Sequence, residues 1–567
     1  MKSRTSFCNA HVLKKDITRF APLWAVYTVF LVVWVFNNSS AFATDNAMAR
    51  MAWSVSRNIG NVAFLFCVYG FGCATLLFGD LFKTRMAGGL HAMPLRRETW
   101  FGTHVLAGFL FAAVPNAVMA IIMAVMFGEY AFVAGLWWLV LTGQFLFHFA
   151  LGVLCVMLSG NLLGHVAAFG TISGFSMIVY SVYGAIYEPM LYGIISESKW
   201  FEFFCPVQFW SGADWLKWDV QHTVAEIYMY VSLGDPSYIS ADPAIQNPKY
   251  IYEGIVTENW IYLGVCAVLA VAFLGLALYL YRRRKLEWAG DFITSKVMGW
   301  VFLILGSVCA AVIVPVVGFA IAFFGILMLW ERTLKVFRKK NLIAFGISAV
   351  AVLLTIGLTA LDITGITTRV PELAQVESVT LNPRWDGSST PLTDPADIQA
   401  VLTAHEYALV DRDPDEGSWY GLEVEYTLKD GSHLRRSYEM NAQVPALDGI
   451  RKILSRWDIV FDGRDPKTVE SQLIEVSFYI EEHDKEGYYT VSRDVYIPPE
   501  DWGEMLEAIQ KDCQEGTMCQ NSVFHEGAIN TLHFRYLETG MTVGYRQGLH
   551  VFEDSSHTMA FLEQYLQ

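Results

Sequence analysis

The amino-acid sequence predicts a polytopic α-helical membrane protein with a C-terminal α+β domain outside the membrane. Of its 567 residues, 54% are hydrophobic and only 17% are charged, a composition unlike that of a water-soluble domain. Charge also divides the chain, because 36 acidic and 16 basic residues follow Gly365 whereas 19 and 24 precede it. We therefore expect an acidic, water-soluble domain attached to a mildly basic membrane domain.

Long apolar runs predict the helices that cross the membrane. A helix of about 20 residues spans about 30 Å of hydrocarbon. The first six runs predict a six-helix core over residues 20–284, with crossings at 20–36, 62–82, 101–127, 132–158, 161–184 and 260–281. The next apolar block, 297–330, is too long for one crossing and fits two short ones folded near Pro315 and Gly318. Together with the run 342–361, this block adds three helices within residues 285–361 and makes nine crossings in all.

Lysine and arginine near helix ends predict the orientation, because cytoplasmic loops are rich in both. Residues 1–19 end in a short amphipathic helix that carries Lys14, Lys15 and Arg19, so we expect the N-terminus in the cytoplasm. The acid-rich loop 185–258 and the domain 366–567 then lie outside. A single crossing over 297–330 is the alternative; it gives eight crossings and places the C-terminal domain inside.

Residues 366–567 predict an α+β domain of one or two lobes. Alternating segments at 422–428 and 436–440 flank Asp430-Gly431, a pair typical of a β-hairpin turn. Helical patterns are present at 396–406 and 446–457. A second block suggests a degenerate internal duplication, with strands expected at 474–480, 488–497, 531–536 and 541–545 and helices at 499–511 and 556–567.

The chain carries no common enzyme signature. It lacks the Gly-rich P-loop with Lys and Ser/Thr, the His-Glu-x-x-His motif and the Gly-x-Ser-x-Gly motif. No Cys and His spacing suggests zinc, and His405-Glu406 and His525-Glu526 are isolated pairs expected at the surface. We therefore expect no catalytic activity, cofactor, metal or nucleic-acid partner, and any ATP hydrolysis would come from a separate subunit.

Two cysteines of the C-terminal domain stand close together in the sequence. Cys513 and Cys519 flank Gly516, so they could close a small disulfide loop if the domain lies outside the cytoplasm. A reducing habitat would leave both as thiols. The sequence keeps both alternatives open.

Three polar residues interrupt the apolar runs. Gln144, His148 and His165 lie within predicted crossings, where polar side chains are candidates for a translocation path. Hydrogen bonding between helices is an equally good reason for their presence. The two readings differ in whether these side chains line a cavity.

The loop between the second and third crossings predicts a docking surface. A simple tether needs only basic residues such as Arg96 and Arg97. This loop also places Leu90 and Leu95 among the charges, and Pro94 fixes a turn. Apolar side chains on a fixed turn are typical of a surface that contacts another protein.

Three segments resemble a known family. The opening HVLKKDITRFAPLW at 11–24, the loop GLHAMPLRR at 89–97, and the linker LDITG at 361–365 followed by RVP at 369–371 are similar to the permease subunits of bacterial ABC-2 type transporters. Within that family they are most like the Ytr-like branch, which has a soluble C-terminal domain. The three additional helices and the acidic domain go beyond the minimal six-helix permease.

The resemblance implies a permease that pairs with a separate ABC ATPase subunit and with a second permease subunit, as a homodimer or heterodimer, in the bacterial cytoplasmic membrane. In such permeases the amphipathic helix and the loop after the second crossing couple the ATPase to the membrane helices, and short helices in the outer loop dip toward the membrane. Carried over, the coupling residues are Asp80, Arg85, Leu90, His91, Pro94, Leu95, Arg96 and Arg97.

The expected function is therefore to couple a partner ATPase to the export of a solute or an envelope-active compound, as in defence against antibiotics. The alternative is a mechanotransmitter, in which ATP hydrolysis inside moves the external domain and no solute crosses. A sensor or scaffold that works without ATP is a third reading.

Overall fold

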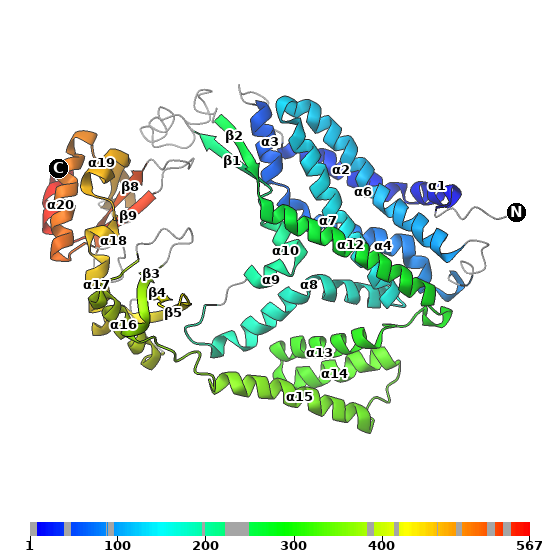
Figure 1. Cartoon of the computed structure of the whole chain (residues 1–567). Helices are drawn as coiled ribbons and strands as arrows, with labels where there is room; N and C mark the ends of the chain where they lie inside the picture. Colours follow the sequence, from blue (N-terminus) through cyan, green and yellow to red (C-terminus); the bar gives the residue numbers. More distant parts are fainter. Residues whose placement is uncertain are drawn as a thin grey trace. The chain divides into compact units, whose positions relative to one another are not determined.

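The computed structural model describes residues 8–38, 47–86, 88, 96–195, 199–221, 249–382, 391–412, 419–461, 463–483, 490–518, 528–536 and 546–566. The chain divides into two compact units (Figure 1). The helical unit comprises Met1–Tyr187, Glu197–Gln221 and Ser240–Ile356. The C-terminal unit comprises Glu188–Ser196, His222–Ile239 and Gly357–Gln567.

Apolar helices build the helical unit, in agreement with the predicted class. A 3-10 turn at Gly128–Tyr130 (η3) divides the longest apolar stretch, Arg97–Leu158, into α6 (Arg97–Phe127) and α7 (Ala131–Leu158). Within the described ranges, seven helical stretches are long and apolar enough to cross a membrane. Besides Arg97–Leu158, they are Ala21–Asn38 (α2), Gly60–Phe82 (α4, Ala63–Phe78, with the 3-10 turns η1 and η2 at its ends), Leu162–Met190 (α8, Leu162–Ile186, and η4), Thr257–Arg283 (α12), Lys296–Ile313 (α13) and Lys339–Ala360 (α15).

The expected break in the block 297–330 is present at Val314. Its backbone is extended (φ −135°, ψ 99°) between α13 and α14 (Pro315–Glu331), and Pro315 is the first residue of α14. A methyl group on Gly299, near the start of α13, would overlap the ring of Trp330, near the end of α14. The block is therefore a hairpin of two helices and not one long helix.

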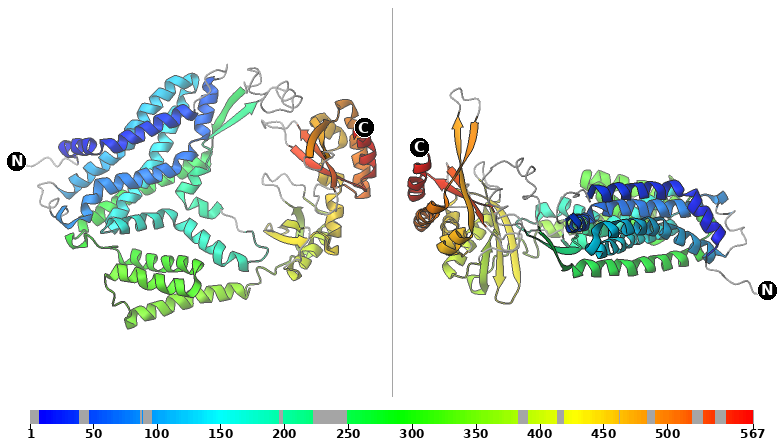
Figure 2. Two further views of the ribbon diagram at one scale, coloured as in Figure 1. Left: turned by 180° about the vertical axis from the view of Figure 1, so that it is seen from behind. Right: turned by 90° about the horizontal axis from the view of Figure 1, so that it is seen from above.

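Helix α7 is the centre of the helical unit and packs against α4, α6 and α12 (Figure 2). Small residues allow this close approach, since a methyl group on Gly70 of α4 would meet the backbone of Phe149, and one on Gly152 would meet Ala74. Trp137 of α7 is fully buried. Gln144 and His148, the polar residues expected in this crossing, are fully buried near the middle of this helix.

Short elements complete the helical unit. Helix α1 (Ala10–Arg19) is the predicted amphipathic helix, whereas α3 (Ala47–Arg57) is not anticipated by any apolar run. The expected outer loop holds α9 (Lys199–Phe203), α10 (Pro206–Ser211) and an antiparallel pair, β1 (Leu216–Gln221) and β2 (Lys249–Ile255). Helix α10 packs on α4, and its Trp210 is fully buried there.

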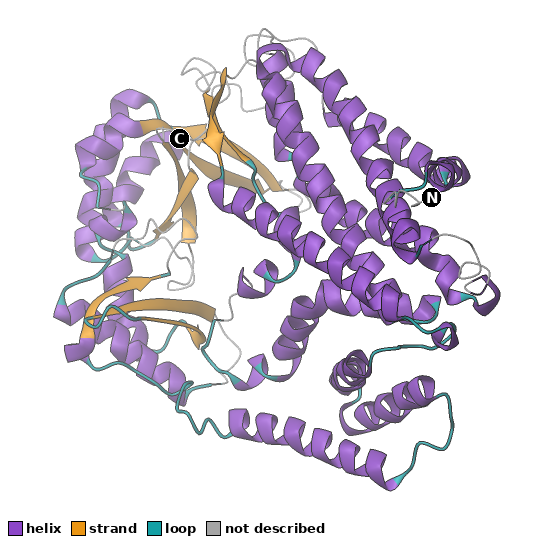
Figure 3. Ribbon diagram, turned by 45° about the vertical axis from the view of Figure 1, so that its right-hand side comes forward, coloured by secondary structure: helices purple, strands orange, loops and turns teal. Residues whose placement is uncertain are grey.

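The C-terminal unit is α+β, as predicted, and holds two antiparallel sheets with separate cores (Figure 3). The first sheet has the order β3-β4-β5, and the second has the order β7-β6-β8-β9. The strand expected at 541–545 lies outside the described residues. The first lobe contains β3 (Val376–Leu381), α16 (Pro395–Val410), β4 (Trp419–Leu428), β5 (His433–Asn441) and α17 (Asp448–Leu454). The second contains α18 (Trp457–Val460), α19 (Pro466–Gln472), β6 (Leu473–His483), β7 (Thr490–Tyr496), α20 (Trp502–Glu515), β8 (Ala528–Tyr536), β9 (Arg546–Phe552) and α21 (Ser556–Leu566).

The two lobes share one order of elements. In the first lobe, β3 pairs with a bridge at Leu392 on one edge and with β4 on the other, and α16 connects the bridge to β4. In the second, β6 pairs with β7 and β8, and α20 connects β7 to β8. Strands β5 and β9 then complete the sheets, and each is followed by a helix. This order supports the internal duplication that the sequence suggests.

Candidate functional site

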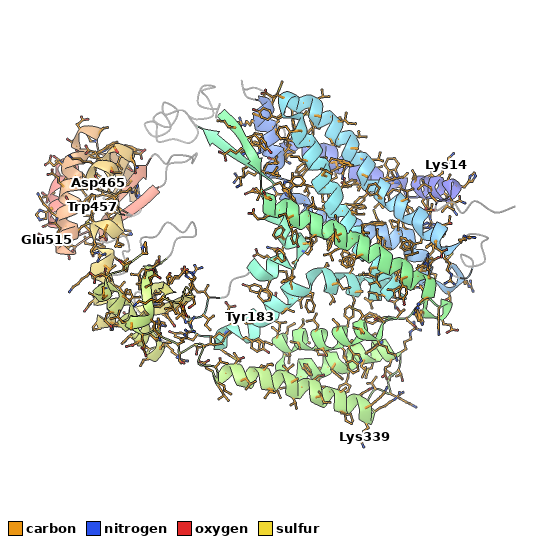
Figure 4. The ribbon with its side chains drawn as sticks, viewed as in Figure 1. Lys14, Tyr183, Lys339, Trp457, Asp465 and Glu515 are labelled. Atoms are coloured by element: carbon orange, nitrogen blue, oxygen red, sulfur yellow. The ribbon has the colours of Figure 1, made fainter. Side chains whose placement is uncertain are left out.

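Helix α1 is held against α6 by polar contacts. The side chain of Asn9 caps α1 by accepting two backbone N–H groups of its first turn, and the Asn9 backbone N–H donates to Thr103 Oγ1 at 3.0 Å. Asp16 is the buried residue of α1, and its Oδ2 lies 3.4 Å from Nδ1 of His104 of α6. Lys14 is exposed (Figure 4). The helix therefore keeps a basic outer face while its inner face is fixed to α6.

The surroundings of Asp16 change its acidity. Burial raises the pKa of this carboxyl from 3.8 to about 6, against the opposing effect of Arg19 and Lys15. The carboxylate form is thus less favourable in the docked helix than in water. Docking of α1 is consequently linked to pH.

We expect α1 to dock more tightly at pH 5 than at pH 7. Between 3.8 and about 6 the docked state binds more protons than the undocked state, so its stability increases as the pH falls and is lost as the pH rises through 6. One pKa unit corresponds to about 1.4 kcal/mol, or about tenfold. Hydrogen exchange over residues 10–19, corrected for the intrinsic pH dependence, is compared with that of Asp16→Asn, which keeps every other titratable group. From pH 7 to pH 5 the native chain should slow about tenfold more than this variant, and equal slowing in the two would contradict the assignment.

The end of α4 also contacts α1. Asp80 belongs to η2 (Gly79–Phe82), and its Oδ2 is 3.8 Å from Nη1 of Arg19. Arg19 is half exposed, so this pair contributes little to stability and mainly orients the two elements. Arg85 is exposed beyond η2. Of the two residues expected to flank the coupling loop, Asp80 therefore faces α1 and Arg85 faces solvent.

The start of α6 is tied to the end of α12. Arg97 Nη1 donates to the backbone oxygen of Arg282 at 3.0 Å, and the Glu98 carboxylate lies 3.0 Å from Arg282 Nε. Arg96, which precedes the helix, is exposed. The coupling residues Leu90, His91, Pro94 and Leu95 lie outside the described residues. At the described end of the predicted loop, Arg96 is therefore exposed, whereas Arg97 holds the start of α6 to the end of α12.

A buried arginine follows α12 and was not singled out by the sequence. Arg284 is 5% exposed, and its guanidinium donates to the backbone oxygens of Val156 (2.8 Å), Met157 (3.3 Å) and Ser159 (2.9 Å) at the end of α7. Carbonyl groups at a helix C-terminus lack intrahelical partners and carry partial negative charge, so a cation is favoured there. Arg284 therefore fixes the end of α12 to the end of α7.

Two of the three predicted intramembrane residues share one face of α7. Gln144 and His148 are one turn apart and fully buried. Within the described residues, neither polar atom of the Gln144 side-chain amide has a hydrogen-bond partner. The His148 ring has one bonded nitrogen, Nδ1, which lies 2.9 Å from the backbone oxygen of Gln144, while its Nε2 has no partner there. The ring of Trp210 lies 5.5 Å from that of His148. Unpaired buried polar atoms favour a role beyond helix bridging for this pair.

His165 belongs to a different environment. Its Nε2 lies 3.0 Å from Thr75 Oγ1 of α4, and its ring stacks on Phe71 at 4.5 Å. It joins α8 to α4, as expected of an interhelical hydrogen bond, but its Nδ1, like Nε2 of His148, has no hydrogen-bond partner within the described residues. The structure thus pairs Gln144 with His148 and assigns His165 a separate bridging contact.

Two of the points at which the chain leaves the helical unit lie close together. Helix α8 leads into residues 188–195, which we call the docked segment, and α15 leads into the linker 361–371. Tyr187 Oη, at the end of α8, lies 2.8 Å from Thr355 Oγ1 of α15. Tyr183, one turn earlier, marks this end of α8 in Figure 4. The two exits are therefore joined by a hydrogen bond.

Within the C-terminal unit, the docked segment adds to the edge of β5. Ile194 forms an antiparallel bridge with Arg436, the backbone N–H of Ser437 donates to the Gly193 oxygen at 3.0 Å, and the rings of Tyr192 and Tyr438 lie 5.3 Å apart. Arg436 also donates from Nη2 to the backbone oxygen of Ile366 in the linker at 2.8 Å. These two connections from the helical unit therefore converge on one strand of the first lobe.

A buried histidine supports this strand from the other side. His405 is fully buried, contrary to the expectation that it lies at the surface; its Nε2 lies 2.8 Å from Tyr438 Oη and its Nδ1 lies 3.1 Å from Tyr426 Oη. Burial, with a smaller effect of Arg436, lowers its pKa to about 4. The imidazole is therefore neutral at pH 7. His525 lies outside the described residues.

The cysteine pair and one carboxylate cluster complete the candidates. Cys513 is buried in α20, and Cys519 lies outside the described residues, so the proposed disulfide stays a prediction. Asp512, Glu515 and His557 lie near one another; Glu515 marks this end of α20 in Figure 4. Both Asp512 carboxylate oxygens accept backbone N–H groups at the start of α21, at 3.1 Å and 2.7 Å, so Asp512 acts as a helix cap.

The chain was compared with family models, curated proteins and solved structures. No family model, curated protein or solved structure matches the chain. The functional conclusion consequently depends on the residues and contacts described above.

Proposed function

We propose that this chain is the membrane-spanning permease subunit of an ATP-binding cassette transporter, which couples a separate ATPase to the export of a solute or an envelope-active compound. In this proposal the chain lies in a bacterial cytoplasmic membrane, with its N-terminus in the cytoplasm and its C-terminal unit outside. A second permease subunit completes the membrane part of the complex.

The observation that carries the proposal is the set of contacts that joins α1 to several long helices. Asp16 contacts α6, Arg19 contacts the end of α4 through Asp80, and Glu98 of α6 contacts the end of α12 through Arg282. A displacement of α1 or of the adjoining loop would therefore reach three apolar helices. A connection between a basic surface and the membrane helices is what a partner ATPase requires in order to move them.

Charge reversal tests the ATPase partnership. We expect Arg96→Glu together with Arg97→Glu to reduce recovery of a P-loop ATPase with the chain about tenfold or more, because an acidic patch would repel the partner surface. The measurement is quantitative mass spectrometry after purification from native membranes in mild detergent.

The matched control is Arg338→Glu, which reverses an exposed arginine between α14 and α15. It should leave ATPase recovery unchanged. Arg96→Glu alone separates the exposed residue from the structural one, since Arg97 also bonds to Arg282. If the native chain reproducibly carries no ATPase, the permease proposal is wrong, and the sensor or scaffold reading gains.

A second candidate function is favoured by the docked segment. Since α8 and α15 both lead to contacts with Arg436, movement of either helix would pull on β5 of the first lobe. A mechanotransmitter needs this kind of connection, because ATP-driven movement inside would have to reach the external unit. In this reading no solute crosses the membrane.

A further inference from the structure

A groove opens in the helical unit between α8, α9 and α13. Its volume is about 460 Å³, within the usual range of small-molecule sites of about 300–1,000 Å³. Most of the wall is aliphatic or aromatic. It includes Phe175, Ser176 and Val179 of α8, Phe201 and Phe204 at α9, and Val301 of α13.

One hydroxyl in this wall lacks a hydrogen-bond partner. Ser176 is 6% exposed, and its Oγ has no partner within the described residues. A serine in a helix commonly donates to the carbonyl group four residues earlier, and Ser173 of the same helix does so to Phe169 at 2.6 Å. Ser176 makes no such bond, which leaves a buried donor beside the groove.

We propose that this groove binds a lipophilic amphiphile that presents a hydrogen-bond acceptor, such as a ketone or ester carbonyl, to the Ser176 hydroxyl. Two of the three walls belong to helices apolar enough to cross a membrane, so the ligand reaches the groove from the hydrocarbon. The apolar walls take its chain, and Ser176 fixes its polar group. Binding is independent of an ATPase; its use as an export substrate rests on the function proposed above.

Other occupants satisfy this geometry less well. A plain acyl chain or an apolar helix of a second copy would fill the volume but leave the Ser176 hydroxyl unpaired in hydrocarbon, which is unfavourable. A bound water needs two to four polar partners, whereas the lining offers the hydroxyls of Thr171 and Ser176. An acceptor on an otherwise apolar molecule meets both demands.

The test compares two probes that differ in one carbonyl group. Binding of octadecan-9-one and of octadecane to the full chain is measured by native mass spectrometry in dodecyl maltoside, a detergent without a carbonyl group. We expect the ketone to bind about three- to tenfold more tightly, the difference that one net hydrogen bond supplies. Ser176→Ala should reduce its affinity to that of octadecane.

Two controls separate the groove from general effects. Ser173→Ala removes a hydroxyl from the same helix that is already bonded within it, and it should keep the preference for the ketone. Val179→Trp and Val301→Trp fill the groove from opposite walls, and either should weaken both probes about tenfold while thermal unfolding stays native-like. Equal affinity of the native chain for both probes, a preference retained in Ser176→Ala, or unchanged binding in both filled variants would overturn the proposal.

The outcome is distinguishable from the fate of the transporter proposal. The assay contains no ATPase, so ketone binding by a chain that recovers no ATPase would keep the groove and remove the export function. Conversely, a stoichiometric ATPase with no ketone preference would keep the transporter and remove the groove.

Discussion

Replacing Arg284 by Ala is expected to destabilise the helical unit by about 3 kcal/mol or more, because hydrogen bonds to a charged donor each contribute about 1.5–3 kcal/mol. The variant would leave the oxygens of Val156, Met157 and Ser159 without their donor at the end of α7. Most domains have only about 5–15 kcal/mol of total stability. We therefore expect a lower unfolding temperature and a large loss of folded protein.

Arg283→Ala is the matched control for this prediction. Arg283 is the preceding residue, is exposed, and contacts the Tyr279 ring with its guanidinium 4.5 Å from the centroid. Loss of such an exposed contact costs about 0.5–1 kcal/mol. Arg284→Lys should fall between the two, since lysine keeps the charge but not the planar fork. Equal unfolding temperatures for Arg284→Ala and Arg283→Ala, measured in the same detergent, would refute the role of Arg284.

The long helices were predictable because each apolar run carries its own signal. Hydrophobic length alone locates the crossings, and Pro315 breaks the block 297–330 because its ring cannot continue a helix from the preceding turn. The hairpin turn at Gly431 was equally local, with φ 79° at a glycine after Asp430. Both kinds of feature depend on neighbours in sequence.

The contacts that build the candidate site were mostly beyond sequence reasoning. Arg282, Arg283, Arg284 and Lys285 form one basic cluster, and the orientation rule counts them alike. The structure gives Arg284 a buried role, because α12 ends at Arg283, the backbone of Arg284 is extended, and its guanidinium meets the end of α7. No pattern in the sequence reports which helix end lies nearby.

Nonlocal pairing explains the other misses. His405 was predicted to lie at the surface, because its hydrogen-bond partners, Tyr426 and Tyr438, lie on strands that are distant from it in the sequence. The docked segment carries no strand pattern of its own, so its bridge to the edge of β5 could be found only from the structure. Gln144 and His148 were predictable as polar residues in an apolar helix, but their unpaired atoms could be found only from the packed structure.

Gly193→Ala should detach the docked segment from β5. Gly193 has φ 76°, which an L-residue adopts at a cost of about 1–2 kcal/mol, and a methyl group there would also overlap the ring of Tyr438. That ring cannot retreat easily, because Tyr438 Oη is bonded to the buried His405. The steric conflict therefore adds to the backbone cost and favours release of the segment.

Gly431→Ala provides a control with the same backbone cost and no conflict. Gly431 has φ 79° in the same sheet, and open space surrounds the position of an added methyl group. The reporter is the Ser437 amide, which donates to the Gly193 oxygen. We expect its hydrogen exchange to accelerate about tenfold or more in Gly193→Ala, a change of about 1.4 kcal/mol, and to stay nearly native in Gly431→Ala. Native exchange of Ser437 in Gly193→Ala would show that the segment does not depend on this contact.

The same pair of variants separates the two candidate functions. If the chain is a mechanotransmitter, Gly193→Ala should keep ATPase recovery but weaken ATP-dependent changes in hydrogen exchange over the first lobe, since the connection through the docked segment is cut while the one through the linker remains. If the chain is an exporter whose C-terminal unit is accessory, solute export should survive in both variants. The distinction follows from where the force would travel: through α8 and the docked segment in the first case, and only as far as the membrane helices in the second.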